Sequence, residues 1–187
     1  FRRLPTKVPP ESTKFTRDKR GEFHFGKTYG WLAREVPERT ALIAAEIRLS
    51  IAAGRSVLVL THSRDMCLAL EAQFPEAGVC HGDVGEAERL RRIRQCNPVI
   101  AIMQLGKQAL NKPNLDTLFV CDPFTKSGVL QQTFGRILRI FSGKKAPAVI
   151  FFEDVHIQPM TKSCDSIRKQ LARWPTSKGG RIPFKRI

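Results

Sequence analysis

The sequence lacks the patterns that mark several large classes of protein. Its five cysteines are scattered, and none forms a Cys-x-x-Cys pair or a Cys/His cluster with zinc spacing. No apolar run approaches the roughly 18 residues that a membrane-spanning helix needs, and the first residues, FRRLPTKVPP, contain no signal-peptide core. We interpret the chain as a soluble intracellular protein, without a membrane segment, whose cysteines are reduced core residues.

Acidic residues are also few. The chain has 17 Asp and Glu against 32 Lys and Arg, which gives a formal net charge of +15. This excess is larger than solubility requires, so a polyanionic partner is expected. Nucleic acid is the first candidate, and an anionic membrane surface is the second.

Residues that serve other enzyme classes are present without the arrangement those classes need. Ser63 has no catalytic partner other than its neighbour His62, which argues against a hydrolase triad. Trp31 and Trp174 are able to stack on bases, although packing is the commoner role of such residues. The four histidines are not spaced for metal binding or for general-base work, and they are His24, His62, His81 and His156.

Length and composition indicate one α/β domain with tails. Residues 1–36 mix prolines with basic residues and show no apolar period, so we expect an irregular basic arm or interdomain connection without core. Residues 37–175 are predicted to form the domain, and residues 176–187 a basic tail. The chain begins at Phe1 rather than Met, and we interpret it as part of a longer protein.

Short apolar runs alternate with helical patterns along the predicted domain. Isoleucines at four-residue spacing predict a helix that begins at Pro37 and ends near Gly54. Further helices are expected around residues 64–74, 85–95, 128–140 and 160–173. Apolar runs rich in β-branched residues predict strands buried on both faces at 56–61, 77–80, 98–103, 117–122 and 146–153. The alternation predicts an open parallel sheet with helices on both faces and ligands at the carboxyl ends of its strands.

The most informative motif is QTFGRILR, residues 132–139. Arg136 and Arg139 are three residues apart, so we expect them to share one helix face and to reach a single polyphosphate. Gly135 leaves room for that approach. A guanidinium donates to two phosphate oxygens and stabilises the charge that develops in phosphoryl transfer. An isolated Gly-Arg-x-x-Arg also fits an ordinary surface helix, so the surrounding motifs decide between the two.

This segment resembles motif VI of superfamily 2 helicases, and three other segments resemble motifs of that family in the same order. VLVLTHSRD (57–65) is similar to motif IV, and VCHGDVGEAERLRRI (79–93) resembles the strand, turn and helix that follow it. IAIMQLGKQALNKPNLDTLFVCDP (100–123) is similar to motif V and its following strand. The resemblance covers residues 38–174 and is closest to phage and bacterial DNA helicases of the DEAH-like, type III restriction group.

The resemblance implies a RecA-like second lobe that closes on an N-terminal lobe with the Walker motifs, in the cytoplasm of a bacterial or phage-infected cell. That first lobe would hold most of the ATP and its Mg²⁺. The resemblance places Gln132, Gly135 and Asn111 at the nucleotide, and gives Arg136 and Arg139 the finger role, with Arg139 as first choice.

The resemblance also implies contacts to the backbone of one nucleic-acid strand, DNA in the first instance and RNA as the alternative. Hydroxyls and backbone amides would position phosphates without reading bases. Gln104 and Lys107 are further candidates, unless their segment is an ordinary loop. The strand contacts carried over from motif IV and the next turn are Thr61, His62, Ser63, His81 and Gly82.

Motif V departs from the family pattern. Met103, Gln108, Asn111 and Lys112 precede Pro113, where relatives have Thr, Glu and Asp before Ile-Pro. The loss of two carboxylates removes acceptors that link nucleotide and strand. We therefore carry two functional hypotheses: the second lobe of an ATP-dependent helicase or translocase, which hydrolyses little ATP alone, and a non-catalytic nucleic-acid-binding module that has lost ATP coupling.

A third hypothesis comes from Gly21, Gly26, Lys27 and Thr28, which satisfy the P-loop pattern GxxxxGKT. A working P-loop needs an apolar strand before it and a helix that opens at its Lys-Thr. The upstream residues STKFTRDKR cannot form a buried strand, and no apolar run with an acidic pair follows. We interpret the match as chance. The alternative is a self-sufficient NTPase that uses Lys27.

Overall fold

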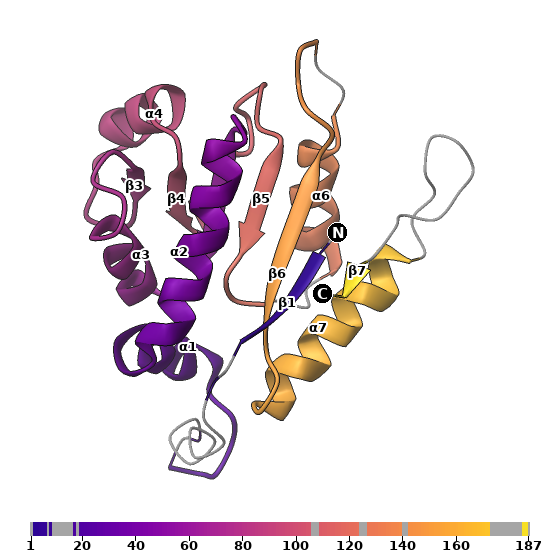
Figure 1. Ribbon diagram of the computed structural model, residues 1–187. Helices are drawn as coiled ribbons and strands as arrows, with labels where there is room; N and C mark the ends of the chain where they lie inside the picture. The colour runs from indigo at the N-terminus through magenta and orange to yellow at the C-terminus, as the bar shows by residue number, and fades with distance from the viewer. Residues whose placement is uncertain are drawn as a thin grey trace.

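Seven parallel strands form one open sheet in the computed structural model of the chain (Figure 1). The structure describes residues 2–6, 8, 17, 19–105, 109–123, 127–139, 142–172 and 185–186. The strand order is β3-β4-β2-β5-β6-β1-β7. The strands are β1 (Arg2–Thr6), β2 (Val57–Thr61), β3 (Gly78–Cys80), β4 (Val99–Ile102), β5 (Thr117–Val120), β6 (Ala148–Asp154) and β7 (Lys185–Arg186). The predicted fold class, an open parallel α/β sheet, is confirmed.

Helices cover both faces of the sheet, as the alternating pattern predicts. One face packs against α1 (Phe25–Glu35), α2 (Pro37–Ala52) and α3 (Arg64–Glu71). The other face packs against α4 (Glu86–Gln95), α6 (Ser127–Ile137) and α7 (Gln158–Leu171). Val57 and Val59 belong to the first core and Leu58 and Leu60 to the second. Because both faces of β2 are buried, its sequence is continuously apolar rather than alternating.

Local sequence signals explain where several helices start and stop. Pro37 opens α2, where its missing N–H costs no hydrogen bond. Ser63 caps α3, with its side chain accepting a hydrogen bond from the Met66 N–H at 3.3 Å. Gly54 follows α2 with a φ of +65°, the left-handed conformation that glycine adopts most readily. No helix in the described ranges is long and apolar enough to cross a membrane.

The expectation of an irregular, coreless segment over residues 1–36 is wrong. Arg2–Thr6 forms β1, which pairs with β6 along five positions, and Leu4 is buried in the core. Helix α1 also lies in this range and buries Leu32 completely. The strand is short and begins with two arginines, one of which, Arg3, forms a buried ion pair with Glu153. Such a strand has no apolar run, so its pattern does not identify it.

The C-terminal tail also contributes to the sheet. Lys185 and Arg186 form β7, which pairs with Arg2 and Arg3 of β1. We expected residues 176–187 to lie outside the domain, and these two residues correct that expectation. Both ends of the chain therefore meet at one side of the sheet (Figure 1).

Candidate functional site

The turn after β2 contains three predicted strand contacts, and Asp122 at the end of β5 organises it. The Thr61 hydroxyl donates to the Asp122 carboxylate, and the His62 N–H donates to Asp122 Oδ2 at 2.6 Å. The Ser63 N–H donates to Thr61 Oγ1 at 3.0 Å. Thr61 and Ser63 are buried, and both hydroxyls are hydrogen-bonded inside the protein. Their hydroxyls shape the turn, and a direct contact of either one with a strand stays a prediction.

Two more turns lie beside this one at the carboxyl edge of the sheet. His81 and Gly82 follow β3, and the side chain of Arg64 at the start of α3 pairs with Asp83 in the same turn. The exposed Gln104 follows β4, and the neighbouring Met103 N–H donates to the Thr61 carbonyl at 2.8 Å. The structure therefore brings the predicted strand contacts of β2, β3 and β4 together. Lys107 and Gln108 lie outside the described residues.

A buried charge cluster includes Asp122, the residue that binds the turn after β2. Arg39 of α2 donates from Nε to Asp154 Oδ1 at 2.7 Å and from Nη2 to Asp154 Oδ2 at 3.1 Å. Its Nη2 also donates to the Cys121 carbonyl at 2.7 Å and lies 3.6 Å from Asp122 Oδ1. Burial lowers the pKa of Arg39, but Asp154 and Asp122 outweigh burial and raise the pKa above its ordinary value.

Sequence reasoning missed this cluster, although a signal for it exists. Asp122 and Asp154 each stand at the end of an apolar run, where a charged side chain needs a partner when it is buried. The partner, Arg39, lies in the first turns of an otherwise ordinary amphipathic helix. Its burial depends on how α2 packs against the sheet, which the sequence does not show.

The predicted nucleotide-facing residues lie on and beside α6. Gln132 and Gly135 are exposed, and a Cβ added at Gly135 would meet no heavy atom within 4 Å. Arg136 donates from Nη1 to the Asn111 Oδ1 at 2.7 Å. The structure thus joins a motif VI arginine to the altered position of motif V. The space over Gly135 agrees with the room we expected there.

The expectation that Arg136 and Arg139 share one helix face needs correction. Helix α6 ends at Ile137, and the exposed Arg139 lies two residues beyond it. The Arg139 N–H makes a long 3.4 Å hydrogen bond to the Arg136 carbonyl. Lys144 Nζ donates to the Arg139 carbonyl at 2.9 Å and also to that of Ile137. A lysine that binds terminal carbonyls stabilises the end of a helix at this point.

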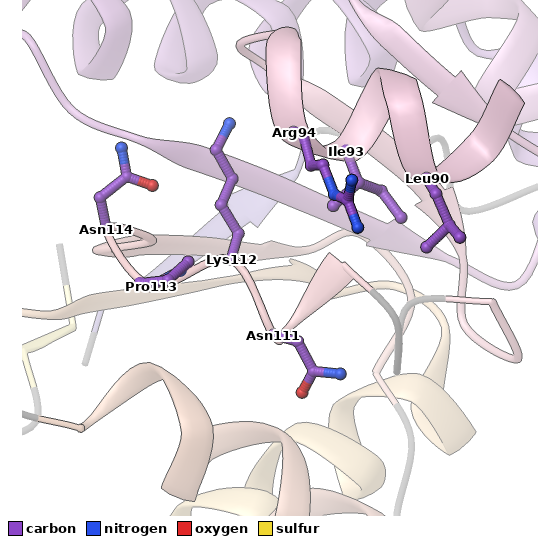
Figure 2. A pocket seen from close by; sticks show the side chains of 7 residues that line it. All are labelled: Leu90, Ile93, Arg94, Asn111, Lys112, Pro113 and Asn114. Atoms are coloured by element: carbon purple, nitrogen blue, oxygen red, sulfur yellow. The ribbon is translucent and has the colours of Figure 1, made fainter. Parts of the chain in front are cut away.

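A pocket of about 410 Å³ opens next to Asn111. Figure 2 shows residues 111–114 on one side of the pocket and α4 on the other. Lys112 donates from Nζ to the Cys96 carbonyl at 2.8 Å, and burial lowers the pKa of this lysine. The pocket residues are Leu90, Ile93, Arg94, Asn111, Lys112, Pro113 and Asn114. Two cations and two amides suit an anionic or strongly polar group, and Asn111 is the one pocket residue that sequence reasoning proposed as a site residue.

The GxxxxGKT segment does not form a phosphate-binding loop. Residues Gly26, Lys27 and Thr28 do lie in the first turn of α1, but the Lys27 N–H donates to the Nδ1 of His24 at 3.1 Å. Thr28 is buried, and its hydroxyl donates to the His24 carbonyl at 2.9 Å. The segment before α1 contains an antiparallel bridge between Arg17 and Phe23, and β1, the parallel strand that precedes it in the chain, already ends at Thr6. This geometry supports the interpretation as a chance match.

Potential metal-binding side chains do not cluster in the described ranges. No group of three or more His, Cys, Asp or Glu side chains in those ranges could hold a metal ion.

Comparisons with known proteins bear on the whole arrangement. No curated protein matches the chain in sequence. Among solved structures, the crystal structure of the C-terminal part of Fun30 ATPase domain is similar at a TM-score of 0.49 and 13% identity. The match covers 76% of this chain and 47% of that one, so the chain spans about half of that structure.

A protein family also matches the chain. The helicase conserved C-terminal domain matches residues 38–141, which is more than half of the chain. The match does not distinguish subgroups, so the likeness to phage and bacterial DEAH-like enzymes stays a prediction. The chain belongs to the helicase conserved C-terminal domain family and has the α/β fold of the second RecA-like lobe of superfamily 2 helicases.

Proposed function

We propose that the chain is the second lobe of an ATP-dependent DNA helicase or translocase. The observation that carries the proposal is the 2.7 Å hydrogen bond between Arg136 and Asn111, which joins motifs VI and V at one surface. A separate group of turns, after β2, β3 and β4, collects at the carboxyl edge of the sheet. One lobe thus offers a nucleotide-facing surface and a strand-facing edge, and a motor needs both.

The residues on α6 fit the phosphates of a nucleotide held by a first lobe. ATP with Mg²⁺ supplies the phosphoryl group and the free energy for closure. Gln132 and Arg136 are four residues apart on one helix face, with the open space over Gly135 beside them. We keep Arg139 as the first candidate for the finger because it is exposed, whereas Arg136 is partly buried and bound to Asn111. Either guanidinium would stabilise charge on the transferring phosphoryl group.

The carboxyl edge of the sheet fits the backbone of one strand. His62, His81, Gly82 and Gln104 stand in adjacent turns, and all are at least partly exposed. Asp122 accepts the His62 N–H of the first of these turns, and Arg39 donates to the carbonyl of Cys121, the residue before Asp122. With a net charge of +15, the chain attracts a polyanion at long range, and these turns would position its phosphates.

The salt dependence of strand binding by the full chain tests the strand-facing part. We expect the affinity for labelled single-stranded DNA to fall steeply between about 50 and 200 mM salt, without an effect of ATP. His81→Ala combined with Gln104→Ala should weaken binding. Leu49→Ala, at a position on α2 that is 65% exposed, serves as the matched control and should leave binding unchanged. Parallel titrations with duplex DNA and with RNA identify the preferred strand.

Failure of all three nucleic acids to bind would overturn the proposal. Strand-stimulated ATP hydrolysis by this chain alone would overturn the assignment as a lone second lobe. If Lys27→Ala then lost this hydrolysis, the result would support the hypothesis of a self-sufficient NTPase.

The alternative, a binding module without ATP coupling, is favoured by one observation. Asn111 stands where the motif V that this segment resembles has an acidic residue, and its neutral amide accepts the Arg136 hydrogen bond. The discriminating experiment uses a protein that joins this lobe to its P-loop lobe. If coupling is intact, Arg139→Ala should lower kcat for ATP hydrolysis by about 10³-fold or more. An unchanged kcat in both Arg136→Ala and Arg139→Ala would favour the binding module.

A further inference from the structure

Four aromatic rings form a series of successive contacts between the protein surface and the turn after β2. Phe23 and Phe25 are in edge contact, with ring centroids 4.6 Å apart. The Phe25 ring lies 6.1 Å from that of Tyr29, which stacks on His62 at 6.0 Å with an interplanar angle of 15°. Phe25 is 41% exposed, whereas Tyr29 is buried. The series therefore begins at the half-buried Phe23, includes the exposed Phe25, and ends at His62, a predicted strand-contacting residue.

The rings are fixed by their surroundings. The Tyr29 hydroxyl donates to the Pro123 carbonyl at 2.8 Å, and burial, together with the charges of Asp122 and Asp154, raises the pKa of Tyr29 well above its ordinary value. Phe25 lies one helical turn before Tyr29, at the first position of α1. The His24 cap holds that turn in place. A ring on a fixed support loses little conformational entropy when it binds a flat partner.

The sequence around the exposed ring is basic. Residues 17–27 contain four basic residues, Arg17, Lys19, Arg20 and Lys27, against two acidic ones. All four basic residues are exposed. An aromatic ring among exposed cations is the combination that binds single-stranded nucleic acid, because bases stack on the ring while cations attract the phosphates. The charge complementarity favours a nucleic-acid strand over an apolar partner.

We propose that residues 17 and 19–27 form a base-stacking surface on which a nucleobase of a single strand stacks against Phe25. Lys27 and Lys19 would attract the flanking phosphates, and the strand would continue over His62 to the turns after β3 and β4. The site rests on the proposed strand-binding function and extends it to a segment outside the helicase family match at 38–141. The GxxxxGKT segment would then bind a nucleic-acid strand and would not bind the phosphates of ATP.

The test uses the full chain and a single-stranded oligonucleotide that carries one 2-aminopurine, whose fluorescence falls when it stacks on an aromatic ring. We expect quenching with the natural chain and with Phe25→Trp. Phe25→Leu should lose most of the quenching and weaken binding by about fivefold or more. Leu68→Ala is the matched control, because Leu68 is also 41% exposed but lies on α3. This control should behave as the natural chain does.

An oligonucleotide with abasic sites separates stacking from a structural effect. Phe25→Leu should bind an abasic strand as well as the natural chain does, because no base is left to stack. Equal affinity and quenching of Phe25→Leu and the natural chain would overturn the stacking surface while leaving the proposed function intact. If the natural chain itself showed no salt-sensitive binding to a single strand, the proposed function would be overturned instead.

Discussion

Replacement of Arg39 by methionine offers a quantitative test of the buried charge cluster. The side chain is 1% exposed, and the substitution removes two hydrogen bonds to Asp154 and one to the Cys121 carbonyl. Asp154 and Asp122 then lose their cationic partner. Removal of one partner of a buried pair costs about 3–5 kcal/mol in unfolding free energy. For a domain of this size each kcal/mol lowers Tm by about 2–4 °C, so the total is about 6–20 °C.

Urea denaturation and calorimetry measure this cost, and two further variants define its cause. Arg48→Met changes the exposed arginine of the same helix and should cost less than about 1 kcal/mol. Adding Asp154→Asn to Arg39→Met should cost less than the sum of the two single changes, because the second change removes one uncompensated charge. Equal stability of Arg39→Met and Arg48→Met, or strict additivity in the double variant, would refute the reasoning.

Two further predictions concern α4 and its contacts. Gly78→Ala should destabilise the fold by about 1–3 kcal/mol in urea denaturation, because the added Cβ would lie 2.9 Å from the Arg92 carbonyl oxygen. Gly82→Ala, where nothing lies within 4 Å, should be nearly neutral, and equal losses would contradict the steric explanation. Hydrogen bonds from Arg91 and Arg92 lower the pKa of Glu88 to about 2. Its stabilising contribution is therefore present above the ordinary glutamate pKa and lost as pH falls towards 2, and a carboxyl NMR titration midpoint above 4 would contradict this assignment.

The central sheet could be predicted because its strands are buried on both faces. The runs at 56–61, 77–80, 98–103, 117–122 and 146–153 correspond to β2, β3, β4, β5 and β6. Each run is short and apolar, and a helix separates most of them. This alternation of strands and helices is enough to predict a parallel sheet. The order of the strands and the partners at each sheet edge depend on tertiary packing.

The first strand could not be found in the same way. β1 contains Arg2, Arg3 and Pro5, residues that count against a buried strand when they are read alone. Arg3 is accommodated because Glu153 and Asp165 provide carboxylates, one from the neighbouring strand and one from α7. Pro5 lies beyond Arg2 and Arg3, the two positions at which β7 pairs with β1, so its missing N–H does not interrupt the pairing with β7.

In the candidate site, too, some residues could be predicted from the sequence and others could not. The residues of motifs IV, V and VI were predicted from their order in the sequence, and the structure shows a hydrogen bond between Arg136 and Asn111. Their functional roles stay predictions. The supporting residues Arg39, Asp122 and Tyr29 belong to no short motif, and their roles follow only from burial and hydrogen bonding. The end of α6 before Arg139 depends on Lys144, five residues further along the chain.

The position of β1 has a practical consequence for any shortened version of this protein. A fragment limited to residues 38–141 would lose β1 and also β6, and so would end the sheet at β5. A fragment that began at residue 38 but kept β6 would present the main-chain N–H and C=O groups of β6 to solvent along the five positions that β1 now occupies. An uncovered strand of this kind, carrying Ile150, Phe151 and Phe152, is a template for pairing with a second chain and hence for aggregation.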